Sequence, residues 1–320
     1  MPKPIPSSLA ESMPQHQNVS PASDEVLRVL GGTGLPDDSR VARLSGDTDS
    51  SHETGALSWD VANETYTSTM QLYKEMVPGA EAPDMRDFIE AGVDFGKLQA
   101  GYEAYKAAGF KPELIFAPLN AGIDFWRGVY GSLCDWQDNN PPSNNSYTLQ
   151  RRGDGDGLYI ADSVAKNWVP LNAEVANSSS MGAHTIAPGG IVWKALVVPT
   201  ASVEDGGLAV NTSFDLSTNS EQFHTQIAAI RDSLDGELNA SNAHMPVGAY
   251  LMMEAMHLYK DRPLMEGYKW TWNAGTFKDA NNNLRAPAAV WVPGVGQVGV
   301  YHGLVDRSDA YLGVRLPVWG

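Results

Sequence analysis

Two aspartates separated by one residue are the first candidates for metal chemistry in this chain. Asp154 and Asp156 stand in the run Asp-Gly-Asp-Gly, which resembles the start of a calcium loop with alternating carboxylates. A complete loop needs a further ligand and a closing glutamate at fixed spacing, and Asp162 is the only later acid close by. A tight turn is the simpler interpretation. Calcium, held by Asp154 and Asp156, is the only cofactor that the sequence suggests.

A glycine-rich motif at residues 294–299 matches the G-x-G-x-x-G pattern of dinucleotide sites. In such sites the motif joins a strand to a helix, whose N-terminus meets the pyrophosphate. Residues 300–305 instead have a strand pattern, so we interpret the motif as a turn. Residues 29–34 also resemble the opening of a nucleotide-binding unit, but the residues that follow break the expected helix. Neither motif predicts a bound nucleotide.

Residues suited to hydrolytic catalysis occur, but not in a recognisable arrangement. No two of the seven histidines have the i, i+4 spacing of a zinc helix, and no serine stands in a G-x-S-x-G elbow. Cys134, the single cysteine, lies in an apolar helical stretch, which favours a buried thiol. Glu204 with Asp205, and Asp306 with Asp309, are acid pairs of the kind that glycosidases use. In a chain with 38 acidic residues such pairs are expected at the surface, so the sequence favours a protein that is not an enzyme.

The charge balance restricts the partners of the protein. Its 38 acidic and 22 basic residues give a formal net charge of −16, whereas binding to nucleic acid or to anionic lipid needs clustered Lys and Arg. No apolar run approaches the ~18 residues of a membrane helix. The first six residues lack the apolar core of a signal peptide. We expect synthesis as a soluble cytoplasmic protein, and we leave open association with a virion or release from the cell.

The elements that must position these residues begin with an N-terminal arm. Residues 1–55 are rich in Pro, Ser, Asp and Gly and poor in aromatic residues. Such a composition predicts an extended or flexible segment, because it offers too little apolar surface to bury. Neighbouring chains would be needed to hold it in place. A homo-oligomer or a larger assembly is therefore an open alternative to a monomer.

Residues 56–137 are predicted to be mainly helical. Apolar residues recur at spacings of three and four from Trp59 to Met76 and again from Phe88 to Tyr105, and each series predicts an amphipathic helix. Gly109 is expected near the C-cap of the second helix. A short buried strand at 113–119 and a helix at 123–136 complete the region.

A polar loop at 138–146 marks the predicted boundary to a C-terminal module spanning residues 138–320. Strand patterns dominate there, most clearly at 157–160 and 191–198, with helices predicted at 221–234 and 247–259. The final stretch, Leu312–Trp319, is apolar where chain ends are usually polar, and it predicts a buried closing strand. The fold class is therefore α+β, with a helical N-terminal half and a β-rich C-terminal module.

Three segments of this module carry a family resemblance. His244–Ala255 is similar to a turn and packed helix of the form R-[LM]-P-T-x-A-E-W-E-x-A, and Tyr268–Asn273 stands in the place of W-x-W-G-N. Leu312–Pro317 is similar to a closing G-F-R-x-[AV] strand. Together they resemble the C-type-lectin-like fold in its sulfatase-modifying-factor form. Val247-Gly248 departs from the usual Thr, and Asn273-Ala274 departs from the usual Gly-Asn.

This form of the fold is shared by the variable proteins of diversity-generating retroelements and by phage receptor-binding proteins. The paired catalytic cysteines of the formylglycine-generating enzymes and the iron-binding histidines of the sulfoxide synthases are absent, so the resemblance implies neither activity. It implies ligand recognition, in which fixed strands and glycine turns display substitutable residues toward a protein or glycan. The candidate ligand-binding residues are Trp291, Tyr301, His302, Arg307, Ser308, Asp309 and Tyr311.

Three alternatives stay open at this stage. The first is that the candidate aromatic residues simply close a small core, and for Trp291 the two interpretations have equal weight. The second is that the chain is a phage or virion structural or assembly protein, to which the N-terminal arm would contribute. The third is a carbohydrate-active enzyme, for which the nine tryptophans would supply sugar-binding surfaces.

Overall fold

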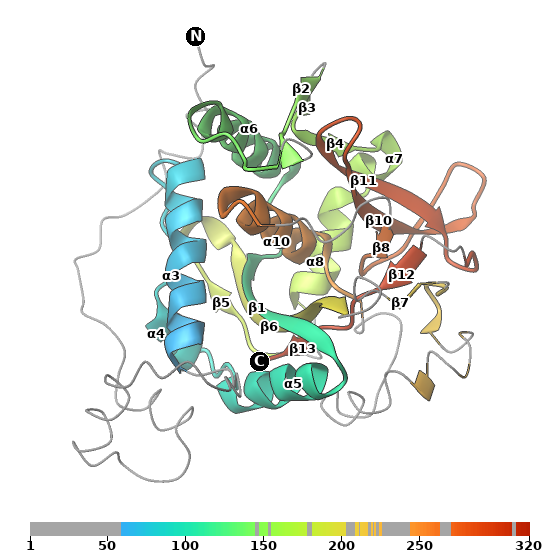
Figure 1. The fold of residues 1–320 in the computed structure, drawn as a ribbon. Coiled ribbons are helices and arrows are strands. Elements are labelled where there is room, and N and C mark those ends of the chain that lie inside the picture. The colour runs from blue at the N-terminus through green and yellow to red at the C-terminus, as the bar shows by residue number, and fades with distance from the viewer. Residues whose placement is uncertain are drawn as a thin grey trace, which may run out of the picture.

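The computed structural model combines helices, which dominate the N-terminal half, with sheets in the C-terminal part (Figure 1). It describes residues 59–144, 147–152, 155–177, 181–202, 209–210, 212–216, 219, 221, 224–225, 244–262, 270–308 and 312–320. The predicted arm of residues 1–55 and most of the predicted helix at 221–234 lie outside these residues. The mixed α and β architecture is confirmed.

The strands of the described residues form two main sheets. The small sheet consists of β1 (Phe110–Pro118), β5 (Thr185–Ile186), β6 (Val192–Ser202) and β13 (Val318–Trp319). The large sheet consists of β4 (Leu158–Ile160), β7 (Ala209–Val210), β8 (Trp270–Trp272), β9 (Phe277–Lys278), β10 (Leu284–Val292), β11 (Gln297–Leu304) and β12 (Leu312–Val314). A short ribbon pairs β2 (Arg151–Arg152) with β3 (Gly155–Asp156).

The helices of the N-terminal half follow the apolar stripes of the sequence, with one break. They are α3 (Trp59–Met76), α4 (Met85–Glu90), α5 (Phe95–Ala107) and α6 (Ile123–Asn139). The stripe predicted as one helix from 88 to 105 is divided between α4 and α5. Gly92 adopts a positive φ of 88° after α4, and Asp94 then caps α5 by accepting a hydrogen bond from the Lys97 amide. Gly109, with φ of 85°, follows α5 at the predicted C-terminal position.

The small sheet joins the two halves of the chain. β1 pairs antiparallel with β6 along its whole length, and β13 pairs with the other edge of β6. Helices α3, α5 and α10 (Val247–Tyr259) surround β1 (Figure 1). One hydrophobic core therefore contains residues from both sides of the boundary that the sequence predicted at residue 138, and residues 138 and 139 themselves belong to α6. The remaining helical segments are α7 (Asp162–Lys166), α8 (Trp168–Asn177) and the 3₁₀ turn η4 (Pro188–Gly190).

The large sheet has the order β4-β11-β10-β8-β12-β7, and β9 also pairs with β10. Its longest pairing is the β10–β11 hairpin, which runs from Arg285 opposite Leu304 to Val292 opposite Gln297. The glycine-rich motif forms the turn of this hairpin and the start of β11, and no helix follows it. Gly296 adopts a φ of 64° in this turn. The interpretation of the motif as a turn is confirmed.

The C-terminal stretch is two strands in two sheets, and not the single closing strand that its apolar pattern predicted. β12 pairs with β7 and β8 in the large sheet, whereas β13 pairs with β6 in the small sheet. Arg315, which is fully buried, lies between them and donates a hydrogen bond to the Pro199 carbonyl. Leu316 accepts a hydrogen bond from the Tyr105 hydroxyl. The burial of the whole stretch was predicted correctly, but its crossing from one sheet to the other was not.

Candidate functional site

The large sheet presents two faces with different surroundings. Because side chains alternate along a strand, Trp291, Val298 and Val300 share one face, which packs into the main hydrophobic core; we call this the core face. The opposite face carries Trp272, Ala288 and several aromatic rings; we call this the aromatic face. A second, smaller core covers part of the aromatic face, with Phe214, Leu216, Leu312 and Val314.

Three rings on the uncovered part of the aromatic face form a cluster. We call Tyr159 of β4, Trp270 of β8 and Tyr301 of β11 the aromatic cluster. The ring centroid of Tyr301 lies 5.0 Å from that of Tyr159 and 4.8 Å from that of Trp270. Tyr159 is 45% exposed, and the other two are half-buried. Rings that already pack on one another lose little conformational freedom when a ligand binds.

Small residues beneath the rings hold the aromatic cluster close to the sheet. A Cβ atom at Gly299 would lie 2.3 Å from Cε2 of Tyr301, so only glycine lets this ring lie over the strand. Gly303 accommodates Trp272 in the same way, with a distance of 2.5 Å to Cη2. Ala288 stands opposite Tyr301 on β10 and leaves space for both rings. Gly299 and Gly303 of β11 therefore leave space for aromatic rings above the strand. This is a second role for the glycines of this region, in addition to the turn that the sequence predicted.

Trp291, a predicted display residue, is 1% exposed and belongs to the main core. The expectation that it points outward is wrong, because its position in β10 places it on the core face, opposite Val298. Its indole N–H has no hydrogen-bond partner among the described residues. The alternative of core packing, which the sequence left open for Trp291, is the one that the structure supports.

His302 is separated from the aromatic cluster by the alternation of the strand. It follows Tyr301 directly and so points to the opposite face, where its ring meets Phe277 edge to face at 5.7 Å. Burial and the charge of Arg285 lower the pKa of His302, while the charge of Asp279 acts in the other direction. Asp279 and Arg285 form an ion pair at 2.8 Å. His302 is half-buried and lies outside the aromatic cluster.

The other predicted site residues follow β11 in the sequence or stand at positions 154 and 156. Arg307 and Ser308 are exposed in the segment after β11. Asp309, Tyr311 and Asp154 lie outside the described residues, as does the side chain of Asp156. Among the residues that the structure describes, no cluster of three or more His, Cys, Asp or Glu side chains could hold a metal ion. Calcium binding at Asp154 and Asp156 stays a prediction.

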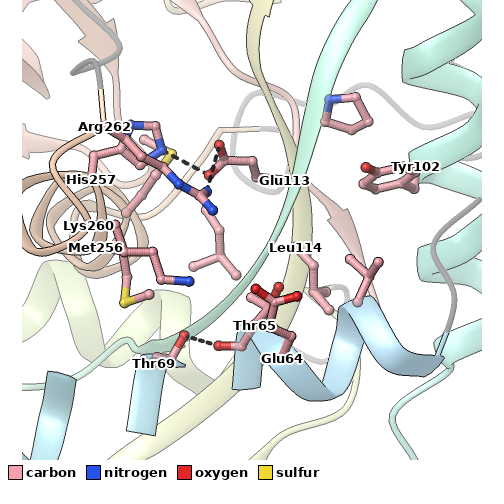
Figure 2. Close-up of a pocket in the computed structure, with 14 residues that line it drawn as sticks. Glu64, Thr65, Thr69, Tyr102, Glu113, Leu114, Met256, His257, Lys260 and Arg262 are labelled. Carbon is pink, nitrogen blue, oxygen red and sulfur yellow. Dashed lines mark hydrogen bonds and ion pairs between the residues drawn. The ribbon is translucent and has the colours of Figure 1, made fainter. Parts of the chain in front are cut away.

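A charged cavity, which the sequence did not reveal, has a volume of about 290 Å³ and is lined by residues of α3, α5, β1 and α10 (Figure 2). Its apolar wall includes Leu114 and Met253. Its polar lining includes Glu64, Tyr102, Glu113, His257, Lys260 and Arg262. Glu113 and His257 are 144 residues apart in the chain, so no local spacing could indicate their contact. The only local signal, basic residues at the end of a predicted helix, is common at helix C-termini.

Glu113 is the central acid of the charged cavity. Its Oε2 lies 2.9 Å from Nε2 of His257, and its Oε1 lies 3.9 Å from Nη1 of Arg262. Burial acts to raise the pKa of Glu113, but the hydrogen bond and charge of His257, with smaller effects of Arg262 and Arg315, outweigh it and lower the pKa. The Glu113 carboxylate is therefore ionised and held against the C-terminal end of α10.

Lys260, the C-cap residue of α10, and Glu64, in α3, line the same cavity (Figure 2). Burial, and then the nearby charge of Arg262, lower the pKa of Lys260, while the charges of Glu64 and Glu113 act to raise it. Within the described part of the chain, neither the Lys260 ammonium nor the Glu64 carboxylate makes a hydrogen bond or an ion pair within 4.0 Å. The cavity is thus lined by a cation and an anion, Lys260 and Glu64, that do not form an ion pair with each other.

Comparison of the chain with protein-family models, with curated proteins and with solved structures finds no match. The family resemblance of the C-terminal segments therefore stays a prediction. In the described part of the chain, no helix combines the length and the apolarity that a membrane crossing requires. The acid pair Glu204 and Asp205 lies outside the described residues, and Asp306 is exposed in the segment after β11.

Proposed function

We propose that the chain is a ligand-recognition protein, which binds a protein or glycan through the aromatic cluster on a C-type-lectin-like scaffold. The observation that carries this proposal is the placement of Tyr301, whose ring lies over Gly299 and between two further exposed or half-buried rings. Flat aromatic surfaces provide large contact area for few rotatable bonds. Such surfaces can pack against the apolar face of a sugar ring or against protein side chains.

The spatial arrangement of the three resembling segments supports the scaffold part of this proposal. Met245, at the start of the first segment, forms a β-bridge with Asn273 at the end of the second. β12 of the third segment pairs in parallel with β8 of the second, with Leu312 opposite Trp270 and Val314 opposite Trp272. Segments that are far apart in the sequence thus meet around one strand, as parts of a single module would.

The proposed site is tested by changing the ring of Tyr301 and measuring binding to glycan and protein arrays. Tyr301→Phe retains the stacking surface and is expected to retain the array signal, whereas Tyr301→Ala is expected to reduce affinity by about 10-fold or more. Leu284→Ala, a truncation of an exposed residue of the same sheet, is the control and should leave binding unchanged. An array ligand that binds all four proteins equally would contradict the proposal.

If the chain is a variable protein, the DNA around its gene should contain the elements that diversify it. A near-copy of the DNA that encodes the C-terminal region, differing mainly at adenines and lying beside a reverse transcriptase gene, would assign the aromatic cluster to a diversified surface. A gene without such a copy, in a protein whose Tyr301→Ala variant loses array binding, would assign it to a fixed receptor-binding surface. The two outcomes separate the two forms of the proposed function.

A further inference from the structure

The charged cavity lies apart from the aromatic cluster and has the composition of a small-molecule site. Its volume of about 290 Å³ is just below the range that is usual for ligand pockets, about 300–1,000 Å³. Leu114 and Met253 are buried and supply an apolar wall, and Glu64, Glu113, His257, Lys260 and Arg262 add charged or titratable groups. A pocket of this size and lining fits one small molecule with an apolar body and polar ends.

Some charged groups of the cavity already form ion pairs within the protein, and others do not. Glu113 is engaged, because His257 and Arg262 hold its two oxygens at 2.9 and 3.9 Å. Lys260 and Glu64 interact electrostatically but do not form an ion pair within 4.0 Å. A cation and an anion that face one cavity without meeting present complementary contacts to a ligand that carries both charges. Lys260 is half-buried, which strengthens its contacts relative to those at an open surface, whereas Glu64 is exposed.

We infer that the charged cavity binds a small zwitterion of the α-amino-acid type. Its carboxylate would pair with Lys260, with Arg262 as the neighbouring cation, and its ammonium would pair with Glu64. Its side chain would lie against the apolar wall of Leu114 and Met253. The role of Glu113 in this arrangement is to fix Arg262 and His257 through contacts that are already formed.

The inference is tested with three matched probes and isothermal titration calorimetry on the full chain. L-leucine carries both charges, N-acetyl-L-leucine lacks the ammonium, and L-leucinamide lacks the carboxylate. L-leucine is expected to bind, and each altered probe is expected to bind at least about 10-fold more weakly, because each loses one charge-assisted contact. Equal binding of N-acetyl-L-leucine would overturn the inference in favour of a simple anion site, and no binding of L-leucine would overturn it outright.

Two variants locate the binding in the cavity. Lys260→Met and Glu64→Gln are each expected to weaken L-leucine binding by about 10-fold, whereas Lys74→Met, an exposed lysine of α3 outside the cavity, should leave it unchanged. Lys260 is also the C-cap residue of α10, where a cation interacts favourably with the helix dipole and can stabilise the helix. If Lys260→Met lowers the melting temperature but leaves L-leucine affinity unchanged, the residue serves only the helix, and the inference is wrong.

Discussion

The two faces of the large sheet are built from the same strands, yet they differ in what their side chains do. On the core face, Trp291, Val298 and Val300 fill space against helices and the main core. On the aromatic face, glycine and alanine lie beneath large rings, and part of that face is left open at Tyr159 and Tyr301. Residues that display side chains on one face of a sheet therefore do not form a consecutive run, because successive side chains along a strand point to opposite faces.

The C-terminal stretch is shared by both sheets, and removing it tests how far the two faces depend on it. Deletion of residues 312–320 removes β12 from the large sheet, β13 from the small sheet and the buried Arg315 between them. We expect loss of cooperative unfolding, measured by circular dichroism during heating, because both cores lose fully buried residues at once. A shortened chain that still unfolds in one sharp transition would contradict the role of this stretch.

Truncation of one aromatic residue on each face should lower the free energy of unfolding by different amounts. Trp291→Ala is expected to lower the free energy of unfolding by about 3–5 kcal/mol, because it opens a cavity in the main core. Tyr301→Ala is expected to lower it by about 1 kcal/mol or less, because its ring is half-buried and its main contacts are two other rings. Urea denaturation measures both. Equal losses would mean that the aromatic cluster is a structural core and not a recognition surface.

The covered part of the aromatic face is expected to respond to acid. His244 is fully buried there, stacks on Phe214 at 4.3 Å and donates from Nε2 to the Phe214 carbonyl at 2.8 Å. Burial is the main cause that lowers the pKa of His244 to about 4. The unfolded chain takes up this proton below about pH 6.5, and the folded chain only near pH 4, so the unfolded state binds more protons in between.

Stability is therefore expected to fall by up to ~3 kcal/mol between pH 6.5 and 4 on account of His244. Urea denaturation at a series of pH values measures this slope. His244→Gln should flatten the slope over this window, whereas His184→Gln, which changes an exposed histidine, should leave it unchanged. A slope that persists in His244→Gln would assign the acid response to other groups and separate it from the aromatic face.

Local patterns predicted the elements of this fold well where one periodicity was uninterrupted. The stripe from Trp59 to Met76 is α3, and the alternation around residues 157–160 is β4. The stripe from Phe88 to Tyr105 was misjudged, because apolar spacing continued across Gly92, where the backbone leaves the helix. The candidate site was predicted only in part. Tyr301 was among the predicted residues, but Tyr159 and Trp270 were not, since β4 pairs with β11, and β8 with β10, only in the folded sheet.

Periodicity and turn residues act over a few neighbouring positions, so the sequence was sufficient to predict α3, α6 and α10, the strands β1, β4 and β6, and the burial of the C-terminal stretch. Three features depend on the folded chain: this stretch crosses between two sheets, Tyr301 and His302 lie on opposite faces, and Glu113 contacts His257 across 144 residues. Strand order, facing and long-range contacts depend on the packing of the whole chain, and a local pattern contains no information about which distant segment will supply the partner.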